Sequence, residues 1–187
     1  PAPGKSGSLQ VRKRSGAVVL EVAWDGNDPA WPLPAFGPGH ALVLAFPSRG
    51  EGNPRAWDTG SRLGGTPGDP EPVPSGPLES VVLNELLLAP EPFVELHNRA
   101  PSPVDLSGCL LQVGTGGATF QFPAGTSLAA NGLMAFAPPG FQPNPRGGAL
   151  LLWTPDARRV LDAVRHGAQP EGVASGPDAD PRMPWQL

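Results

Sequence analysis

Two carboxylates lie where they could act together on one substrate or ion. Glu85 and Glu95 belong to neighbouring apolar runs, residues 81–88 and 93–98. If these runs form paired strands, the two side chains could face each other, and paired carboxylates can transfer protons or hold a cation. Both residues also fit ordinary solvent-facing strand positions, and we favour that interpretation. We therefore predict no catalytic residue at this pair.

The residues that usually bind metals or attack substrates are few and scattered. His40, His97 and His166 are far apart in sequence, whereas a metal site needs three or four ligands that converge. Cys109 is the single cysteine, which allows no intrachain disulfide and no cysteine-based zinc site. It lies in an apolar run, where a buried thiol is inert. We predict no enzyme activity, no metal and no cofactor.

Several loop segments have the composition of ion sites without the spacing of one. The run 25–28 (Asp-Gly-Asn-Asp) and the pair Asp178 and Asp180 are rich in oxygen ligands but lack the full spacing of a calcium loop. The glycine-rich segment 114–117 is not a phosphate loop, because no lysine follows it and no helix begins there. The basic residues 12–14 would give only a weak contact with an anionic polymer. We interpret all of these as solvated turns or hairpin tips.

Tryptophans in glycine- and proline-rich segments are a better indication of recognition. Trp31 and Trp57 lie in such segments, where a partner protein or a polysaccharide could stack on an exposed ring. The same rings could instead close the ends of a β-sandwich, which is the interpretation we favour. Partner contact at Trp31 and Trp57 remains the alternative.

The composition predicts many short strands joined by loops. Gly (25) and Pro (27) together exceed a quarter of the 187 residues, and the apolar residues cluster in short Val, Leu and Phe runs. A net charge of −4 is not that of a nucleic-acid-binding protein. No apolar run approaches the roughly 18–20 residues of a membrane-spanning helix.

The clearest strand pattern lies in residues 92–123. Polar and apolar residues alternate over 93–98 with the period of two expected of a half-buried strand. Asn98 ends this run, where its tolerance of left-handed backbone predicts a turn. A second turn is predicted at 105–108, with Gly108 free to take a positive φ. Pro123 ends a later strand because it cannot donate to a ladder.

In this order the segments resemble the lamin-tail domain, an immunoglobulin-like β-sandwich of nuclear lamins that also occurs in many secreted bacterial proteins. The family pattern contains E-L-x-N, L-x-G-W, F-x-F-P and a Leu-x-x-G turn, and Cys109 stands where the family usually has Trp. The resemblance implies an all-β fold: an immunoglobulin-like β-sandwich of short antiparallel strands with long Gly/Pro-rich loops. The apolar runs after residue 81 predict about seven strands, the number that such a sandwich needs. The matching positions, to which the resemblance assigns structural roles, are Glu95, Leu96, Asn98, Leu106, Gly108, Phe120, Phe122 and Pro123.

An internal repeat relates the two ends of the chain. The hairpin predicted at 8–24 recurs 141 residues later without a gap, so that Gly7 matches Gly148 and Leu9 matches Leu150. The further matches are Val11 with Leu152, Val19 with Val160, Leu20 with Leu161, Glu21 with Asp162 and Gly26 with Gly167.

The repeat predicts two domains. Residues 1–68 would be the C-terminal part of a first lamin-tail-like copy, 69–78 a stiff Pro-rich linker, and 79–187 a second, nearly complete copy. In the alternative, both hairpins join one larger sandwich.

For function, the resemblance implies a non-catalytic structural or interaction module of a larger bacterial extracytoplasmic protein. Such a module would be extracellular, periplasmic or at the cell surface, and would act by protein–protein contact or by spacing other domains. The hairpin 8–24 would carry an unpaired edge, so we expect another protein, or another part of the same polypeptide, to pair with it. The alternatives are an accessory substrate-binding module of a secreted nuclease or phosphoesterase, and a carbohydrate-binding or adhesion module.

Overall fold

The chain is all-β and divides into two compact units, residues 1–72 and 73–187. A computed structural model describes residues 6–73, 75–177 and 185. Among these residues there is no α-helix, and none of the helical turns is long and apolar enough to cross a membrane. The helical turns are the 3-10 helices η1 (Leu33–Ala35), η2 (Pro47–Arg49), η3 (Pro54–Ala56) and η4 (Pro77–Ser80).

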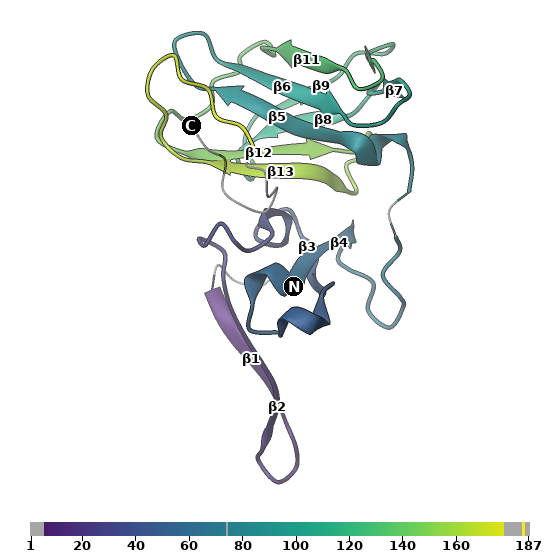
Figure 1. Cartoon of the computed structure of the whole chain (residues 1–187), viewed down its shortest axis with the longest axis vertical. Coiled ribbons are helices and arrows are strands. Elements are labelled where there is room, and N and C mark those ends of the chain that lie inside the picture. The colour runs from purple at the N-terminus through teal and green to yellow at the C-terminus, as the bar shows by residue number, and fades with distance from the viewer. Residues whose placement is uncertain (1–5, 74, 178–184, 186–187) are drawn as a thin grey trace. The chain divides into compact units, whose positions relative to one another are not determined.

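The second unit is the predicted immunoglobulin-like β-sandwich (Figure 1). Its strands are β5 (Val81–Leu87), β6 (Phe93–Asn98), β7 (Val104–Asp105), β8 (Leu110–Val113), β9 (Thr119–Gln121), β10 (Ser127–Leu128), β11 (Leu133–Phe136), β12 (Gly148–Trp153) and β13 (Val160–His166). One antiparallel sheet has the order β11-β6-β5, and the facing sheet has the order β13-β12-β8-β9. The two-residue strands β7 and β10 pair with each other, and they account for the excess over the seven strands expected.

Alternation along the strands explains how the sandwich is filled. In β6 the side chains of Val94 and Leu96 are buried, while Glu95 between them is partly exposed. The facing sheet contributes Leu111, Leu150 and Leu152. Burial of each such side chain stabilises the fold by roughly 1.5–3 kcal/mol. A cluster of edge-to-face and tilted rings, Phe120, Phe122 and Phe136, packs beside these leucines.

One long edge of the sandwich is closed by side chains and by the chain that follows β13. Asp162 Oδ2 accepts a hydrogen bond from the backbone N–H of Leu83 at 2.8 Å, and so joins the two sheets. Gln169 Oε1 accepts from the N–H of Leu88 at 3.0 Å, and Leu86 exchanges two backbone hydrogen bonds with Ser175. The outer edge of β5 therefore presents satisfied rather than free backbone groups.

The dipeptide Asn131-Gly132 is a hairpin signal in the sequence, but the hairpin that it predicts does not form. Asn131 does have the left-handed backbone that such a turn needs, with φ 50°. However, the strands on either side pair elsewhere, since β10 pairs with β7 and β11 pairs with β6. The Asn-Gly signal identified the local turn, whereas the pairing was decided by which strand the apolar face of β11 covers.

The first unit contains two separate antiparallel hairpins. They are formed by β1 (Ser6–Arg12) with β2 (Val18–Asp25), and by β3 (His40–Leu44) with β4 (Trp57–Leu63). The hairpins predicted at 8–24 and at 149–164 are thus both present, as β1–β2 and β12–β13.

The segment predicted as a linker, 69–78, is tied to a unit at each end. Glu71 accepts hydrogen bonds from the Ser61 backbone N–H and, at 2.7 Å, from Thr66 Oγ1, so the Gly65–Gly68 turn is held to the first unit. At the other end, Leu78 packs on the core of the second unit. The boundary between the units falls between residues 72 and 73.

Candidate functional site

The hairpins β1–β2 and β12–β13 share their pairing geometry. Each is interrupted by a register shift at the corresponding place, between Val11 and Arg12 and between Leu152 and Trp153. The turn between the paired strands differs, because Arg12 pairs with Val18 whereas Trp153 pairs with Val160. The second turn is therefore longer by one residue.

This extra residue corrects the ungapped alignment along the second strand. The first strands keep the offset of 141, so Leu9 still corresponds to Leu150. The second strands are offset by 142, and the pairing makes Leu20 the counterpart of Asp162. Val22 becomes the counterpart of Val164, and both are buried, at 4% and 6% exposure. A gap was therefore needed, contrary to the prediction.

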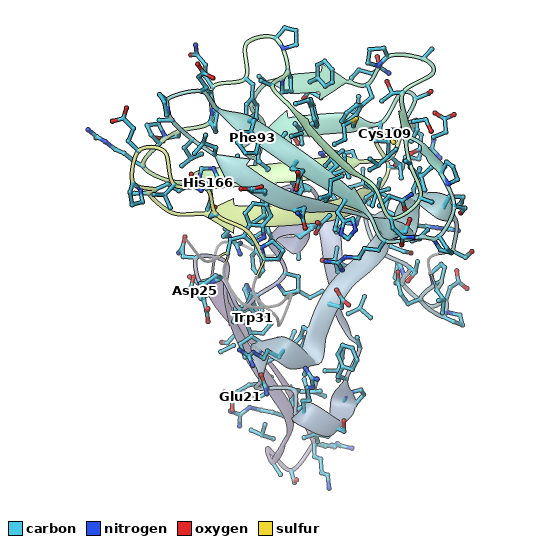
Figure 2. All side chains as sticks on the ribbon, turned by 45° about the horizontal axis from the view of Figure 1, so that its top comes forward. Glu21, Asp25, Trp31, Phe93, Cys109 and His166 are labelled. Atoms are coloured by element: carbon cyan, nitrogen blue, oxygen red, sulfur yellow. The ribbon has the colours of Figure 1, made fainter. Side chains whose placement is uncertain are left out.

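Glu21 illustrates the consequence. It was matched to Asp162, whose carboxylate reaches the opposite sheet. In the structure Glu21 lies on the polar face of its hairpin (Figure 2), where its Oε1 accepts a hydrogen bond from Gln10 Nε2 at 2.5 Å. A shift of one residue reverses the side of the sheet on which a side chain lies. The two carboxylates therefore have different roles.

The corrected register brings out a glycine–ring pair that sequence reasoning missed. Gly7 pairs with Trp24, and Gly148 pairs with His166. A Cβ on Gly7 would lie 2.6 Å from Trp24 Cζ2, and a Cβ on Gly148 would lie 2.9 Å from His166 Nε2. In each hairpin a ring thus covers a glycine of the neighbouring strand, an arrangement that pins strand register. The signal lay in the sequence, but only a gapped alignment shows it.

The two hairpins differ sharply in burial. Leu150 and Leu152 are fully buried in the core of the second unit, at 0% exposure. Their counterparts Leu9 and Val11 are 51% and 49% exposed. Every residue of β1 is exposed, and among the described residues β1 pairs only with β2. Leu9 and Val11 are therefore open where their counterparts form a core, although Val22 on the same face is buried, as its counterpart Val164 is.

The E-L-x-N motif is organised around Asn98, which is completely buried. Its Nδ2 donates to the carbonyl oxygens of Ser102 and Ala129 at 2.8 and 2.9 Å, and its Oδ1 accepts from Ala100 N at 2.9 Å and Ser80 Oγ at 2.8 Å. The side chain thereby joins the end of η4, the loop after β6 and the loop after β10. Such a network has a structural role, since all of its polar atoms are satisfied within the domain.

The left-handed backbone expected at Asn98 does not occur. The residue ends β6 in extended pairing with Val81, and the positive φ values of described non-glycine residues belong to Asn131 and Ala157. Asparagine is needed here for its side-chain amide rather than for its backbone tolerance. Only an amide supplies two donors and an acceptor at one position.

The remaining motif positions lie in core and turn roles. Leu96, Leu106 and Phe122 are buried, and Gly108 has the expected positive φ of 77°. The turn at 105–108 is held by Asp105 Oδ1, which accepts from Ser107 N at 2.8 Å. Pro123 follows β9, Phe120 is partly buried within that strand, and Glu95 lies on the outer face of its sheet.

Glu85 and Glu95 are direct partners across β5 and β6. Glu95 Oε1 accepts a hydrogen bond from Asn84 Nδ2 at 2.7 Å, and both glutamates are partly exposed. A register shift places Asn84 as the extra residue beside them. Within residues 6–73 and 75–177 there is no cluster of three or more His, Cys, Asp or Glu side chains that could hold a metal ion.

The histidines occupy three separate strands. His40 in β3 is buried, and its Nδ1 lies 2.7 Å from the carbonyl oxygen of Gly60. His166 at the end of β13 is also buried (Figure 2), and desolvation lowers its pKa. His97 lies partly exposed in β6. Histidines scattered in this way are expected at the surface or in turns, and for two of the three this expectation is wrong, because they belong to the interior.

The oxygen-rich run 25–28 forms local turns. Asp25 Oδ1 accepts from Asn27 N at 2.9 Å, and Asp28 Oδ1 accepts from Ala30 N at 2.9 Å. These bonds are those of ordinary Asx turns. Asp178 and Asp180 lie outside the described residues.

The glycine-rich and basic segments are hairpin tips, as predicted. Residues 114–117 connect the paired strands β8 and β9, and the N–H of Val113 donates to Ala118 O across the tip at 2.9 Å. Lys13 N donates to Ala17 O at 2.8 Å and closes the turn between β1 and β2.

Trp31 is not the exposed ring that partner contact requires. It is 3% exposed, and its ring lies 6.3 Å from that of Trp57, centroid to centroid. Trp57 begins β4 and is partly buried, with its Nε1 donating to Glu51 O at 2.8 Å. The rings pack against each other within the first unit, which leaves Trp31 no free face for stacking.

Cys109 is buried, so we expect its thiol to be inert in the folded protein. Desolvation, with a smaller contribution from the charge of Asp105, raises the pKa of Cys109 to about 11. A rise of about two pH units from the ordinary value lowers the thiolate fraction on the order of a hundredfold. Reaction with a disulfide reagent at pH 8 should therefore be at least that much slower in the folded chain than in urea. Equal rates would show that Cys109 is accessible.

Asp162 should make the stability of the second unit depend on pH. Desolvation raises the pKa of this carboxyl, although hydrogen bonds from Leu83 and Ala163 partly oppose the rise. Because the folded state then holds the proton more tightly than the unfolded state, the contribution of Asp162 is greatest at low pH and is lost as the pH rises through the folded pKa. Between pH 3 and 7, the melting temperature of the wild type should fall relative to that of the Asp162→Asn variant as the pH rises. A difference that moves the other way would contradict this assignment.

No protein-family model matches the chain, and no curated protein sequence matches it either.

Proposed function

We propose that this chain is a non-catalytic structural and interaction module that works by protein–protein contact through the hairpin β1–β2. We further propose that it belongs to the lamin-tail type and to a larger bacterial extracytoplasmic protein, with residues 1–72 derived from one copy and 73–187 from another. The observation that carries the proposal is the exposure of Leu9 and Val11, whose counterparts Leu150 and Leu152 form a core. The order of the sequence motifs supports the lamin-tail type.

The exposed face is large for so short a hairpin. Leu9 and Val11 lie beside Leu20 of β2, while Val22 on the same face is buried, and near the tip of the hairpin Val18 and Val19 are 45% and 55% exposed. An isolated two-stranded hairpin is at best marginally stable in water. Exposed apolar surface of this kind usually marks an interaction site.

The proposed lack of catalysis is supported by how the candidate groups are placed. Glu85 and Glu95 form a partly exposed pair, and Cys109 is buried. Each histidine lies on a strand of its own. Catalysis needs a nucleophile or base together with a group that orients it.

Selection of binding peptides would test the contact without assuming a partner. A library of displayed random peptides is selected on the full chain and then measured on a Leu9→Gln, Val11→Gln double variant. We expect enriched peptides to bind the double variant at least about tenfold more weakly, a loss of about 1.4 kcal/mol. Ser8→Gln, on the opposite face of the same strand, is the matched control and should retain binding. Peptides that bind all three proteins equally would show that the contact lies elsewhere.

A further inference from the structure

The outer edge of β1 has no neighbouring strand among the described residues. In an antiparallel pair, alternate residues turn their backbone N–H and C=O groups away from the partner strand. Over residues 6–11 those outward groups receive no hydrogen bond from any described side chain or loop. The contrast is with β5, whose edge is closed by Asp162, Gln169 and Ser175.

The second unit shows what covers this edge when the hairpin is part of a sandwich. There the outer edge of β12 pairs antiparallel with β8. Leu111 is opposite Leu152, and Val113 is opposite Leu150. A second apolar layer, which includes Leu83 and Leu96, lies over the same face. The strand and the layer both come from residues 79–147.

We propose that β1 is completed by strand addition, and that the occupant is a half-sandwich of the kind that residues 79–147 form in this chain. The incoming strand runs antiparallel to β1 and resembles β8. Carrying the register of β8 on β12 over to β1 places its two alternate apolar residues opposite Leu9 and Val11. This inference rests on the proposed function and specifies the partner of that same surface.

The opposing layer is required as well as the strand. Strand addition alone would satisfy the backbone of β1 but would leave the face of Leu9 and Val11 in water. In the second unit the equivalent face is buried by both the neighbouring strand and the facing sheet. A short extended peptide therefore fits the site less well than a half-sandwich does.

The positive charge at the tip of the β1–β2 hairpin favours an acidic residue in the incoming strand. The incoming strand would begin beside Arg12, since Leu110 is opposite Trp153 and Trp153 corresponds to Arg12. Lys13 and Arg14 follow immediately. An acidic residue at the start of the incoming strand would meet these three cations, with the modest gain typical of exposed ion pairs.

The test replaces residues 1–6 by a second copy of residues 79–147, so that residue 147 of the added copy precedes Gly7 as it precedes Gly148 in the second unit. Hydrogen exchange then follows the amides of residues 7–12. We expect their protection to rise by at least about tenfold over the unextended chain. Leu9→Ala should reduce that protection by at least about tenfold in the extended chain and leave the unextended chain unchanged. An extension carrying Leu111→Lys in the added copy is the matched control and should give no protection.

Two outcomes would overturn the inference. In one, the extended chain leaves residues 7–12 as unprotected as before while the second unit stays intact. In the other, the unextended chain already protects these amides and does so more strongly at higher protein concentration, which would make the occupant a second copy of the chain. Peptide selection reports separately on the proposed function. If selected peptides need Leu9 for binding but the amides of the extended chain stay unprotected, the half-sandwich is rejected as the occupant while the proposed contact surface stands.

Discussion

Shortening Leu150 to alanine is expected to lower the free energy of unfolding of the second unit by about 3–5 kcal/mol. Leu150 is at 0% exposure between the two sheets, so the change removes buried methyl groups and leaves a cavity that the neighbouring leucines fill only in part. The same substitution at Leu9, its counterpart at 51% exposure, should cost less than about 0.5 kcal/mol.

The pair of substitutions is its own control, because residue type, strand and position in the hairpin are matched. Denaturant unfolding of the full chain, with hydrogen exchange used to assign each transition to a unit, would measure both costs. A large cost at Leu9 in the unextended chain would mean that its surface is already covered in solution. A small cost at Leu150 would contradict the sandwich core.

Replacing Asn98 by alanine is expected to destabilise the second unit by about 3–5 kcal/mol. The change removes four hydrogen bonds and leaves partly buried partner groups, the carbonyl oxygens of Ser102 and Ala129 and the N–H of Ala100, without their donors or acceptor. Leaving buried polar groups unpaired costs more than the net value of the bonds themselves.

The variant Asn98→Asp keeps the shape of the side chain but removes the amide donors, and so separates the two contributions to stability. A carboxylate has the same outline but faces two carbonyl oxygens that require a donor, so its pKa should rise in the folded state. A raised pKa makes the variant most stable at low pH and progressively less stable as the pH climbs past about 4. Asn84→Ala, on the outer face of the same sheet, is the control and should cost less than about 1 kcal/mol. A pH-independent Asn98→Asp variant would show that the amide donor is dispensable.

Much of the fold of the second unit could be predicted from the sequence, because its strands and turns follow local sequence patterns. The alternation in 93–98, the turn at 105–108 and the proline at position 123 each fix an element without long-range information. The pairing partners of β10 and β11, the strands on either side of Asn131, could not be predicted in this way, because they depend on which apolar surface each strand covers in the folded domain.

The site was only partly predictable, for a related reason. The repeated hairpin was visible in the sequence, but the extra residue in its second turn changes every equivalence after it. The role of Asn98 could not be inferred either, because its partners lie in η4 and in two loops that only the folded chain brings together. Trp31 lies in a segment of loop-like composition, and its burial agrees with the packed ring that we favoured over partner contact.

The outer edge of β5 has hydrogen-bonding partners and the outer edge of β1 has none among the described residues, which has a consequence for the solubility of the purified protein. Open strands recruit other open strands, and growth of that kind leads to fibrils and precipitates. When the protein aggregates on storage, we therefore expect residues 6–12 to form the first intermolecular strand pairs and residues 81–87 to form none. A lysine placed at Ser8 should lengthen shelf life while leaving the second unit intact.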